Sequence, residues 1–244
     1  MSVTRPQYGW DPMELRDALR TTGAVRRFTD ESVDDATVAS ILDVARFAPS
    51  GGNRQGWRVV VVRDLGLRRR IRDLYLPGWY DYLAMNRAGL VPWAPVTDRQ
   101  AEEAALPGAR AIAEKAAAGP GDFAEHLDEV PVLLVVLADL RVLAATDRDF
   151  DRYGLVGGMS IFPFVWSILL AARDHGLGGV TTSMLTRREP EVRAALGAPD
   201  HFAVVAGMAL GHPVHQPTRL RRAPVEEFAT YDNFAGVPVA SPNA

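Results

Sequence analysis

The sequence contains no cysteine among its 244 residues, and this absence removes whole classes of chemistry. Disulfide scaffolds, thiolate nucleophiles and cysteine-ligated zinc sites are all excluded. The sequence also lacks a large excess of charge of one sign, because the net charge is −3 and acidic and basic residues are interspersed. We therefore expect neither nucleic acid nor a membrane as a partner. The first twelve residues contain no apolar run typical of a secretory signal, which predicts a cytoplasmic protein.

Several well-known site motifs are missing as well. No Gly-x-Gly-x-x-Gly follows a predicted strand, so a Rossmann dinucleotide site is not supported, and the P-loop and Gly-x-Ser-x-Gly motifs are absent. His212 and His215 lie in a proline-containing loop, where we predict no metal site. Asp147, Asp149 and Asp151 alternate like the start of a calcium loop, but its glycine and glutamate are missing, so we predict a solvated loop.

One long run, residues 155–172, carries no charge, and its length approaches that of a membrane span. Gly157, Gly158 and Pro163 interrupt it, and the rest of the chain resembles a water-soluble domain. An apolar helix can also lie in a protein core or in an obligate interface. We interpret the run as such a helix and expect no membrane contact.

Apolar residues make up 48% of the chain, which is enough for the core of one domain. Short, wholly apolar runs at 59–62, 130–137 and 202–210 are typical of strands covered on both faces. Helical spacing or helix-start signals predict helices at 11–20, from 34, at 65–76, from 155 and at 189–197. Strands that alternate with helices predict an α/β or α+β domain with helices on both faces of a sheet.

Two segments differ from this pattern. Residues from 77 to about 129 begin rich in aromatic side chains, and we interpret them as a lid-like insertion that is helical at 102–118. The tail, about 214–244, has too little apolar surface to fold on itself, so we expect it to lie along another subunit. Four arginines near the start of the helix at 65–76 are interpreted as its solvated face: Arg68, Arg69, Arg70 and Arg72.

Three loop segments carry residues suited to binding a ligand. Arg26 and Arg27 offer guanidinium groups that match a phosphate or an electron-rich ring edge. Residues 49–57 (PSGGNRQGW) combine glycines, which allow a close backbone approach, with neutral hydrogen-bonding side chains. Residues 178–183 (GGVTTS) present small side chains and backbone N–H groups. Each segment alone is also typical of an ordinary loop or turn.

Taken in order and spacing, these segments resemble the FMN-dependent nitroreductase family. The likeness is carried by RRFTDESV, by ARFAPSGGNRQGWRVVVVRD, by SIFPFVWSILLAARDHGLGGVTTSML, and by ALGHP followed by RLRRAPVEEF. It covers most of the chain, and residues 77–129 are its least family-like part. The resemblance implies an α+β domain spanning 1–244, with a mixed β-sheet flanked by helices, that assembles as an intertwined homodimer with FMN at the interface.

The resemblance also implies where FMN would be held. Arg26 would lie near the flavin pyrimidine or the ribityl chain, and the loop at 49–55 would approach from the second subunit. Thr182 and Ser183 would lie by the N5 edge, and Arg222, with Arg219 or Arg221, would hold the phosphate. The implied cofactor contacts are Arg26, Arg27, Pro49, Ser50, Gly51, Gly52, Asn53, Gln55, Thr181, Thr182, Ser183, Arg219, Arg221 and Arg222.

The chain departs from the family pattern in three places. Thr22-Gly23-Ala24 stands where the family often has Arg-Arg-Ser, so one phosphate-binding arginine is missing, and Arg20 or the tail arginines are expected to replace it. Trp166-Ser167 replaces a Gln-Asn pair in the apolar helix. Gln55-Gly56-Trp57 replaces Gln-Pro-Trp.

The implied activity is hydride transfer from NAD(P)H through flavin N5 to a nitroaromatic, a quinone or a similar planar acceptor, in a ping-pong sequence. FMN carries the redox chemistry, so we name no catalytic side chain and no metal. Trp79, Tyr82 and Trp93 are predicted to line the substrate slot and stack on flat acceptors. The alternatives are a specialised flavoenzyme (natural-product dehydrogenase, dehalogenase or flavin-cleaving enzyme) and a non-enzymatic FMN-binding or storage protein.

Overall fold

The computed structural model describes residues 13–241. The start of the first predicted helix, at Asp11 and Pro12, lies outside them. The helices are α1 (Leu15–Thr21), α2 (Asp35–Ala45), α3 (Leu65–Arg87), α4 (Arg99–Ala105), α5 (Gly108–Ala117), α6 (Phe162–Asp174) and α7 (Glu189–Leu196). The strands are β1 (Trp57–Val61), β2 (Val132–Asp139), β3 (Gly178–Thr182) and β4 (Phe202–Gly211). Short 3₁₀ turns are η1 (Gly51–Asn53), η2 (Val156–Ser160), η3 (Met184–Arg188) and η4 (Val225–Glu227).

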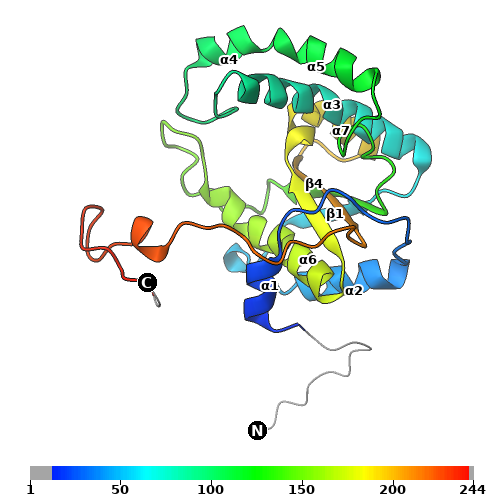
Figure 1. The fold of residues 1–244 in the computed structure, drawn as a ribbon. Helices are drawn as coiled ribbons and strands as arrows, with labels where there is room; N and C mark the ends of the chain where they lie inside the picture. Colours follow the sequence, from blue (N-terminus) through cyan, green and yellow to red (C-terminus); the bar gives the residue numbers. More distant parts are fainter. Residues whose placement is uncertain (1–12, 242–244) are drawn as a thin grey trace.

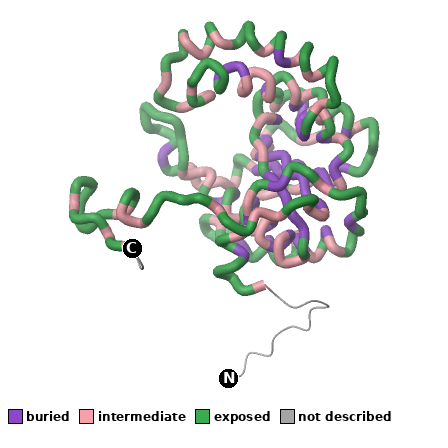
Figure 2. Tube along the Cα trace, viewed as in Figure 1, coloured by how far each residue is buried: buried purple, intermediate pink, exposed green. Residues whose placement is uncertain are grey.

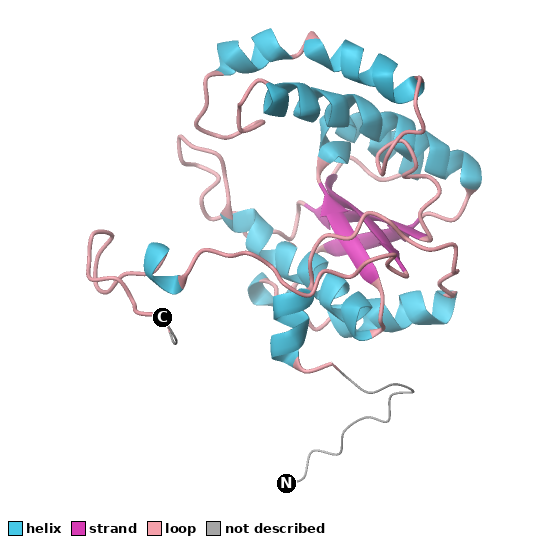
Figure 3. Cartoon of the chain, in the orientation of Figure 1, coloured by secondary structure: helices cyan, strands magenta, loops and turns pink. Residues whose placement is uncertain are grey.

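One sheet organises the domain, with strand order β1-β2-β4-β3 and antiparallel pairing throughout. Within residues 13–241, the one parallel contact is an isolated bridge between Ala24 and Gly179. The four-stranded sheet itself is antiparallel, where a mixed sheet was expected. Helices lie on both sides of the strands (Figure 3), which confirms the predicted α+β class.

The core lies on the two faces of the central strand β2 (Figures 1 and 2). Val132, Leu134 and Val136 pack with α2 and α6, whereas Leu133 and Val135 pack with α3 and α7. This follows from the two-residue period of a strand, which sends alternate side chains to opposite faces. All of these residues are fully buried, so β2 must be apolar on both faces, as its sequence predicts.

Helix ends follow the capping signals in the sequence. The Asp34 carboxylate accepts a hydrogen bond from the Thr37 backbone N–H at 2.7 Å and starts α2. Gly197 ends α7 with a φ of 63°, a left-handed conformation that glycine adopts without strain. Both predicted helices are confirmed.

Strand β1 lies at the edge of the sheet, with Arg58 exposed and its valines only half-buried. The wholly apolar run at 59–62 predicted a strand covered on both faces. Val59 and Val61 pack against the core at α2 and α6, whereas Val60 and the buried Val62 pack against the core at α3 and α7. Both faces are therefore covered, although less completely than those of β2.

Helix α3 is longer than predicted. It was expected to end near Leu76 but continues through Pro77 to Arg87, into the segment interpreted as a lid. A proline inside a helix removes one hydrogen bond, but tertiary packing compensates here. A Cβ on Gly78 would lie only 3.2 Å from the Met184 carbonyl oxygen, so α3 rests directly on η3. The predicted helix at 102–118 is two helices, α4 and α5.

The uncharged run at 155–172 is also divided. It begins as η2, and the α-helix α6 starts only at Phe162, with Pro163 in its first turn, where a missing N–H costs nothing. Within residues 13–241, no helix is long and apolar enough to cross a membrane.

The Asp147 loop, residues 147–156, is not merely solvated as predicted. The Asp147 side chain is 2% exposed. Its carboxylate accepts hydrogen bonds from the Leu155 N–H at 2.7 Å and from Arg152 Nη1 at 2.8 Å. The aspartate therefore closes the loop just before α6.

This closure should depend on pH. The Leu155 N–H and Arg152 lower the pKa of Asp147 below its ordinary value of 3.8. The stabilisation is therefore complete above that value and is lost as the pH falls through the lower folded pKa. We expect the protection factor of the Leu155 amide, which is its intrinsic exchange rate divided by the observed rate, to fall below about pH 4 in the native protein. The Asp147→Asn variant should exchange faster already at pH 7, and equal protection in both proteins at pH 7 would contradict this role.

Candidate cofactor site

A cavity of about 370 Å³ lies where the N-terminal loop, β3, α6 and the C-terminal tail meet. The Val25 N–H donates to the Gly179 carbonyl at 2.9 Å and fixes the N-terminal loop along β3. The cavity, called the cofactor cavity below, is lined by Thr22, Gly23, Ala24, Arg26, Phe162, Val165, Trp166, Leu169, Gly179, Val180, Thr181 and Arg222.

Two arginines from opposite ends of the chain meet here. Arg26 comes from the N-terminal loop and Arg222 from the tail, and both are exposed. Arg222 Nη1 donates to the Arg221 carbonyl at 2.7 Å. Among the described residues, no carboxylate lies within ion-pair distance of either guanidinium. Two uncompensated cations in one cavity suit an anionic ligand such as a phosphate.

The tail reaches this cavity by packing on the small residues at 22–24. A Cβ on Gly23 would lie 2.8 Å from Leu220 Cδ2, and Gln216 Nε2 donates to the Thr21 carbonyl at 2.9 Å. A large side chain at Gly23 would displace Leu220. Residues 22–24 are small where the family often has arginines, and the tail that packs on them places Arg222 in the same cavity.

Strand β3 forms one wall. The sequence predicted only a turn here, but residues 178–182 pair with β4. A Cβ on Gly179 would lie 2.5 Å from Leu210 Cδ2 and 2.9 Å from the Ala209 carbonyl oxygen, so glycine is required for this close approach. Val180 points into the core, and Thr181 on the other face is exposed to the cavity.

Next along β3, Thr182 is held by a side chain that sequence reasoning missed. The Tyr75 hydroxyl and Thr182 Oγ1 lie 3.1 Å apart, within hydrogen-bonding distance. Tyr75 is 1% exposed, and burial raises the pKa of its phenol. The only sequence signal was its spacing of four from Ile71, another buried residue of α3. Ser183, which follows, is exposed and starts η3.

Helix α6 forms the apolar wall. Phe162, Val165, Trp166 and Leu169 share one face of it. Phe162 is 60% exposed and Trp166 is 38% exposed, so a flat surface is open to a ligand. Arginines beside an apolar wall and threonine hydroxyls form a donor set that fits FMN, which combines a phosphate with a planar ring.

The loop at 49–55 lies elsewhere. Gly51 N–H donates to Ser160 Oγ at 3.0 Å, and Gln55 N–H donates to Ser50 Oγ at 2.9 Å. Pro49 lines a separate cavity against Ser167 and Leu170 of α6. Ser167 lies about 160° around α6 from Leu169, and no residue of the loop lines the cofactor cavity. Helix α6 therefore separates this loop from the cofactor cavity of its own chain.

This loop is conformationally strained and solvent-facing. Asn53 and Gln55 have φ values of 53° and 51°, in the left-handed region that costs a non-glycine residue free energy. Gly52, with a φ of 61°, adopts the same region without strain. Residues 51–55 are exposed on the single chain. Five other predicted contacts do not line the cofactor cavity: Arg27, Thr182, Ser183, Arg219 and Arg221.

The three predicted substrate residues form one row with Tyr75. Ring centroids lie 6.2 Å apart for Tyr75 and Trp79, 5.4 Å for Trp79 and Tyr82, and 6.4 Å for Tyr82 and Trp93. This aromatic row begins at Thr182 and ends at the loop before α4. There the Arg187 guanidinium lies 4.8 Å from the Trp93 ring centroid.

Tyr80 is turned away from this row. Its hydroxyl donates to Glu125 Oε1 at 3.0 Å, and burial together with Glu125 raises its pKa to about 12. Trp93 adopts a φ of 55°, and its N–H donates to the Glu102 carboxylate at 2.9 Å. Trp93 also lines a cavity of about 470 Å³ with Asp81 and Arg187.

Comparison with known proteins identifies the family that this chain resembles. The Nitroreductase family model matches residues 19–212. An NADH dehydrogenase from Thermus thermophilus is 28% identical over 221 residues, covering 90% of this chain and 96% of that protein. A 5,6-dimethylbenzimidazole synthase from Rhodospirillum rubrum is 33% identical over 214 residues, covering 80% and 82%.

A solved nitroreductase structure has the same fold. A Tyr-to-Ala mutant of an FMN- and NADPH-dependent nitroreductase from Sphigopyxis sp. strain HMH superposes with a TM-score of 0.60 at 25% identity, covering 91% of this chain and 100% of that one. The matched region contains Arg26, the loop at 49–55, α6 and β3. The chain therefore belongs to the nitroreductase family of oxidoreductases.

Proposed function

We propose that this protein is an NAD(P)H-dependent FMN oxidoreductase that reduces small planar acceptors such as nitroaromatics or quinones by a ping-pong sequence. The observation that supports this most is the meeting of Arg26, Arg222 and β3 around one cavity with an apolar wall. Bound FMN would supply hydride transfer through its N5 atom. The protein's own part is to hold, orient and shield the ring.

The phosphate end is assigned to Arg222. Its side chain comes from the tail that packs over Gly23, and it has no carboxylate partner among the described residues. Guanidinium groups bind phosphate through paired N–H donors. The sequence predicted Arg222 together with Arg219 or Arg221, and the cavity lining supports Arg222 alone.

Arg26 is assigned to the ring end. It projects from the backbone segment that the bridge between Ala24 and Gly179 holds against β3. A fixed cation at this position stabilises negative charge on a reduced ring, because it does not have to reorganise as the charge develops. Tyr75 fixes the Thr182 hydroxyl beside it, so the same edge has an oriented hydrogen-bonding group.

We also propose that the protein is a cytoplasmic homodimer. On one chain the apolar side chains of Met159 in η2 and Phe162 at the start of α6 are 70% and 60% exposed. Beyond Arg222, the C-terminal arm, residues 223–241, runs away from the domain (Figure 1), with Phe228 70% exposed and Phe234 fully exposed. Exposed apolar surface of this kind marks an interface. A second copy would bring its loop at 49–55, which faces away from its own cofactor cavity, to the neighbouring ring.

The test is an anaerobic titration of the purified, FMN-loaded protein with NADPH and with NADH, followed at the flavin absorbance. We expect stoichiometric bleaching and then recovery when a quinone or nitrobenzene is added. Bleaching without recovery would exclude these acceptors and favour a specialised reaction. A protein that binds FMN but is not bleached by either nucleotide would be a storage protein.

The aromatic row should control which acceptor is used. Trp93→Ala and Tyr82→Ala remove a flat stacking surface, and each stacked pair contributes about 0.5–1.5 kcal/mol. We expect kcat/KM for a quinone relative to a nitroaromatic to change several-fold in both variants. Tyr80→Phe, whose hydroxyl faces Glu125, is the control and should behave like the unmodified enzyme. Unchanged kinetics in both alanine variants would exclude this role.

A further inference from the structure

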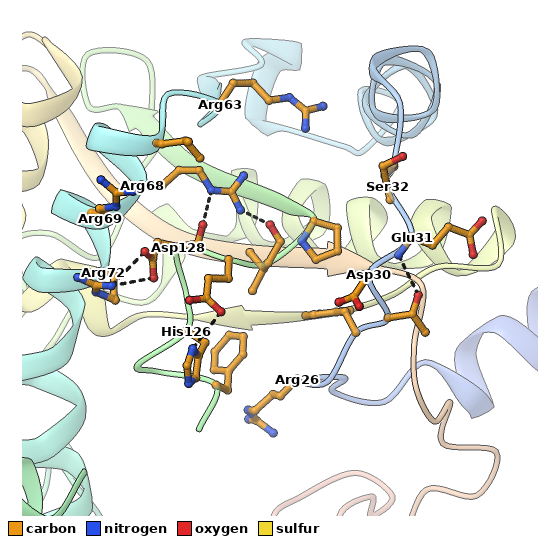
Figure 4. A pocket seen from close by; sticks show the side chains of 18 residues that line it. Arg26, Asp30, Glu31, Ser32, Arg63, Arg68, Arg69, Arg72, His126 and Asp128 are labelled. Carbon is orange, nitrogen blue, oxygen red and sulfur yellow. Dashed lines mark hydrogen bonds and ion pairs between the residues drawn. The ribbon is translucent and has the colours of Figure 1, made fainter. Parts of the chain in front are cut away.

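The arginines at the start of α3 do not form a simple solvated face. Arg68 is 6% exposed, and it lines a second cavity of about 820 Å³ with Arg63, Arg69 and Arg72 (Figure 4). Residues 28–33 form the opposite wall, and residues 123–131 complete the lining. The predicted solvated face is therefore wrong for Arg68, although Arg69 and Arg70 are exposed. This space is called the arginine cavity below.

Backbone carbonyls hold Arg68 in place. Its Nε donates to the Asp128 carbonyl at 2.7 Å, its Nη1 to the Val62 carbonyl at 3.4 Å, and its Nη2 to the Val130 carbonyl. Carbonyl groups satisfy the N–H donors but carry no net charge. An arginine stays protonated in a protein, so a nearly buried positive charge borders the cavity.

The acidic residues of the lining are mostly engaged. Both Asp128 oxygens lie 3.0 Å from Arg72 Nη1, and Glu129 lies 3.0 Å from His126 Nδ1. Glu31 lies 3.5 Å from His212 Nε2, which places a carboxylate beside the histidine pair of the tail.

The lining of the arginine cavity has more unpaired arginines than unpaired carboxylates. Within residues 13–241, Arg26, Arg68 and Arg69 lie in this lining without a carboxylate at ion-pair distance, against Asp30 alone among the acids. Arg63 pairs with Asp35, which lies outside the cavity. The α3 wall is therefore positive, and the opposite wall carries Asp30 and Glu31, of which only Glu31 meets a histidine (Figure 4).

We propose that the arginine cavity binds a nucleoside phosphate, with the phosphate on the arginine wall and a sugar hydroxyl on Asp30. Arginine forks match phosphate geometry, and a carboxylate accepts hydrogen bonds from hydroxyl donors. Phe28 and Phe123 give the same cavity apolar surface. Its volume lies within the range of about 300–1,000 Å³ that small-molecule sites occupy, so it suits a nucleotide better than a lone ion.

Arg26 lines both this cavity and the cofactor cavity, so the two are neighbours. The nucleoside phosphate could then be the adenosine end of the reduced nicotinamide donor or a free nucleotide. The first source depends on the proposed function, whereas binding itself does not.

Calorimetric titration of the full-length protein with ADP tests the proposal, with Arg69→Ala as the main variant. Arg69 is exposed and has no ion-pair partner among the described residues, so its removal should not disturb folding. The next residue, Arg70, is also exposed but lies outside the lining, and Arg70→Ala is the matched control. We expect Arg69→Ala to weaken ADP binding about tenfold, as loss of a charge-assisted contact should, and Arg70→Ala to leave it unchanged. No binding by the unmodified protein, or equal losses in both variants, would overturn the proposal.

Asp30→Asn tests the orientation of the ligand. This variant should bind ADP several-fold more weakly, but its affinity for pyrophosphate, which has no sugar, should not fall. Equal weakening of both probes would show that Asp30 contacts no hydroxyl and would overturn that assignment.

Donor kinetics then separate the two sources. If the cavity holds the donor's adenosine end, Arg69→Ala should raise the KM for the nicotinamide donor, with the rate at saturating donor unchanged. If it holds a free nucleotide, that KM should stay constant and ADP should bind alongside the donor. Calorimetry needs no flavin, so failure of the FMN assignment would leave this test readable.

Discussion

Replacing Arg222 by alanine should weaken FMN binding about 10- to 100-fold, because the variant loses a charge-assisted phosphate contact of about 1.5–3 kcal/mol. Arg222 lines the cofactor cavity together with residues 22–24, none of which is an arginine. The measurement is a fluorescence titration of the flavin-free protein with FMN. The affinity of the unmodified protein should also fall with added salt more steeply than that of the variant.

Arg219→Ala provides the matched control for this prediction. It removes the same charge from the same tail, but Arg219 does not line the cofactor cavity. We expect its FMN affinity to remain within about twofold of the unmodified value, as is usual for an exposed charge. Equal weakening by both substitutions would mean that the tail acts only through its general positive charge.

The second large effect is on stability. Arg68→Ala should lower the free energy of unfolding by about 3 kcal/mol, because three backbone carbonyls around a buried guanidinium lose their donor. Those carbonyls belong to Val62, Asp128 and Val130, so Arg68 joins the start of α3 to the segment that leads into β2. Urea denaturation measures the difference.

Two companion variants identify the cause. Arg68→Met keeps most of the packing of the side-chain stem but supplies no donor, so it should be nearly as unstable as the alanine variant. Arg70→Ala, an exposed neighbour on the same helix, should change stability by less than about 0.5 kcal/mol. A methionine variant as stable as the unmodified protein would show that packing, and not the carbonyl contacts, makes Arg68 necessary.

The elements that the sequence predicts well are those with local signals. Asp34 and Gly197 cap α2 and α7 where expected, and β2 and β4 match apolar runs that are buried on pairing. Strand β3 was missed because it is only five residues long and begins with two glycines, which weaken a strand signal, although Val180 and the two threonines favour a strand. Its conformation comes from pairing with β4 and from the space that Gly179 leaves beside Leu210.

Long-range contacts also decided the other differences. Pro77 is a local signal for a helix end, but the packing of Gly78 on η3 carries α3 onward to Arg87. Asp147 appeared to be one of three solvated aspartates, yet backbone N–H groups eight and nine residues later enclose it. No pattern in the local sequence encodes these contacts.

In the candidate site, too, the sequence predicts residues that belong to a motif and misses those that depend on long-range contacts. Arg26, Thr181 and Arg222 were identified because the order of motifs resembles a family, and the structure brings them to one cavity. Tyr75 could not be singled out, because a buried tyrosine on a helix looks like any core residue until Thr182 is found 3.1 Å from its hydroxyl. The sequence predicted a second phosphate arginine, Arg219 or Arg221, but neither lines the cofactor cavity.

The most direct test of the account is a crystal structure of the protein grown with FMN. We expect the phosphate within hydrogen-bond distance of Arg222, the ring along β3 with Arg26 at its pyrimidine edge, and the loop at 49–55 of a second copy on the same ring. FMN bound away from Arg222 and β3, or a cofactor cavity filled by the chain's own side chains, would contradict the assignment.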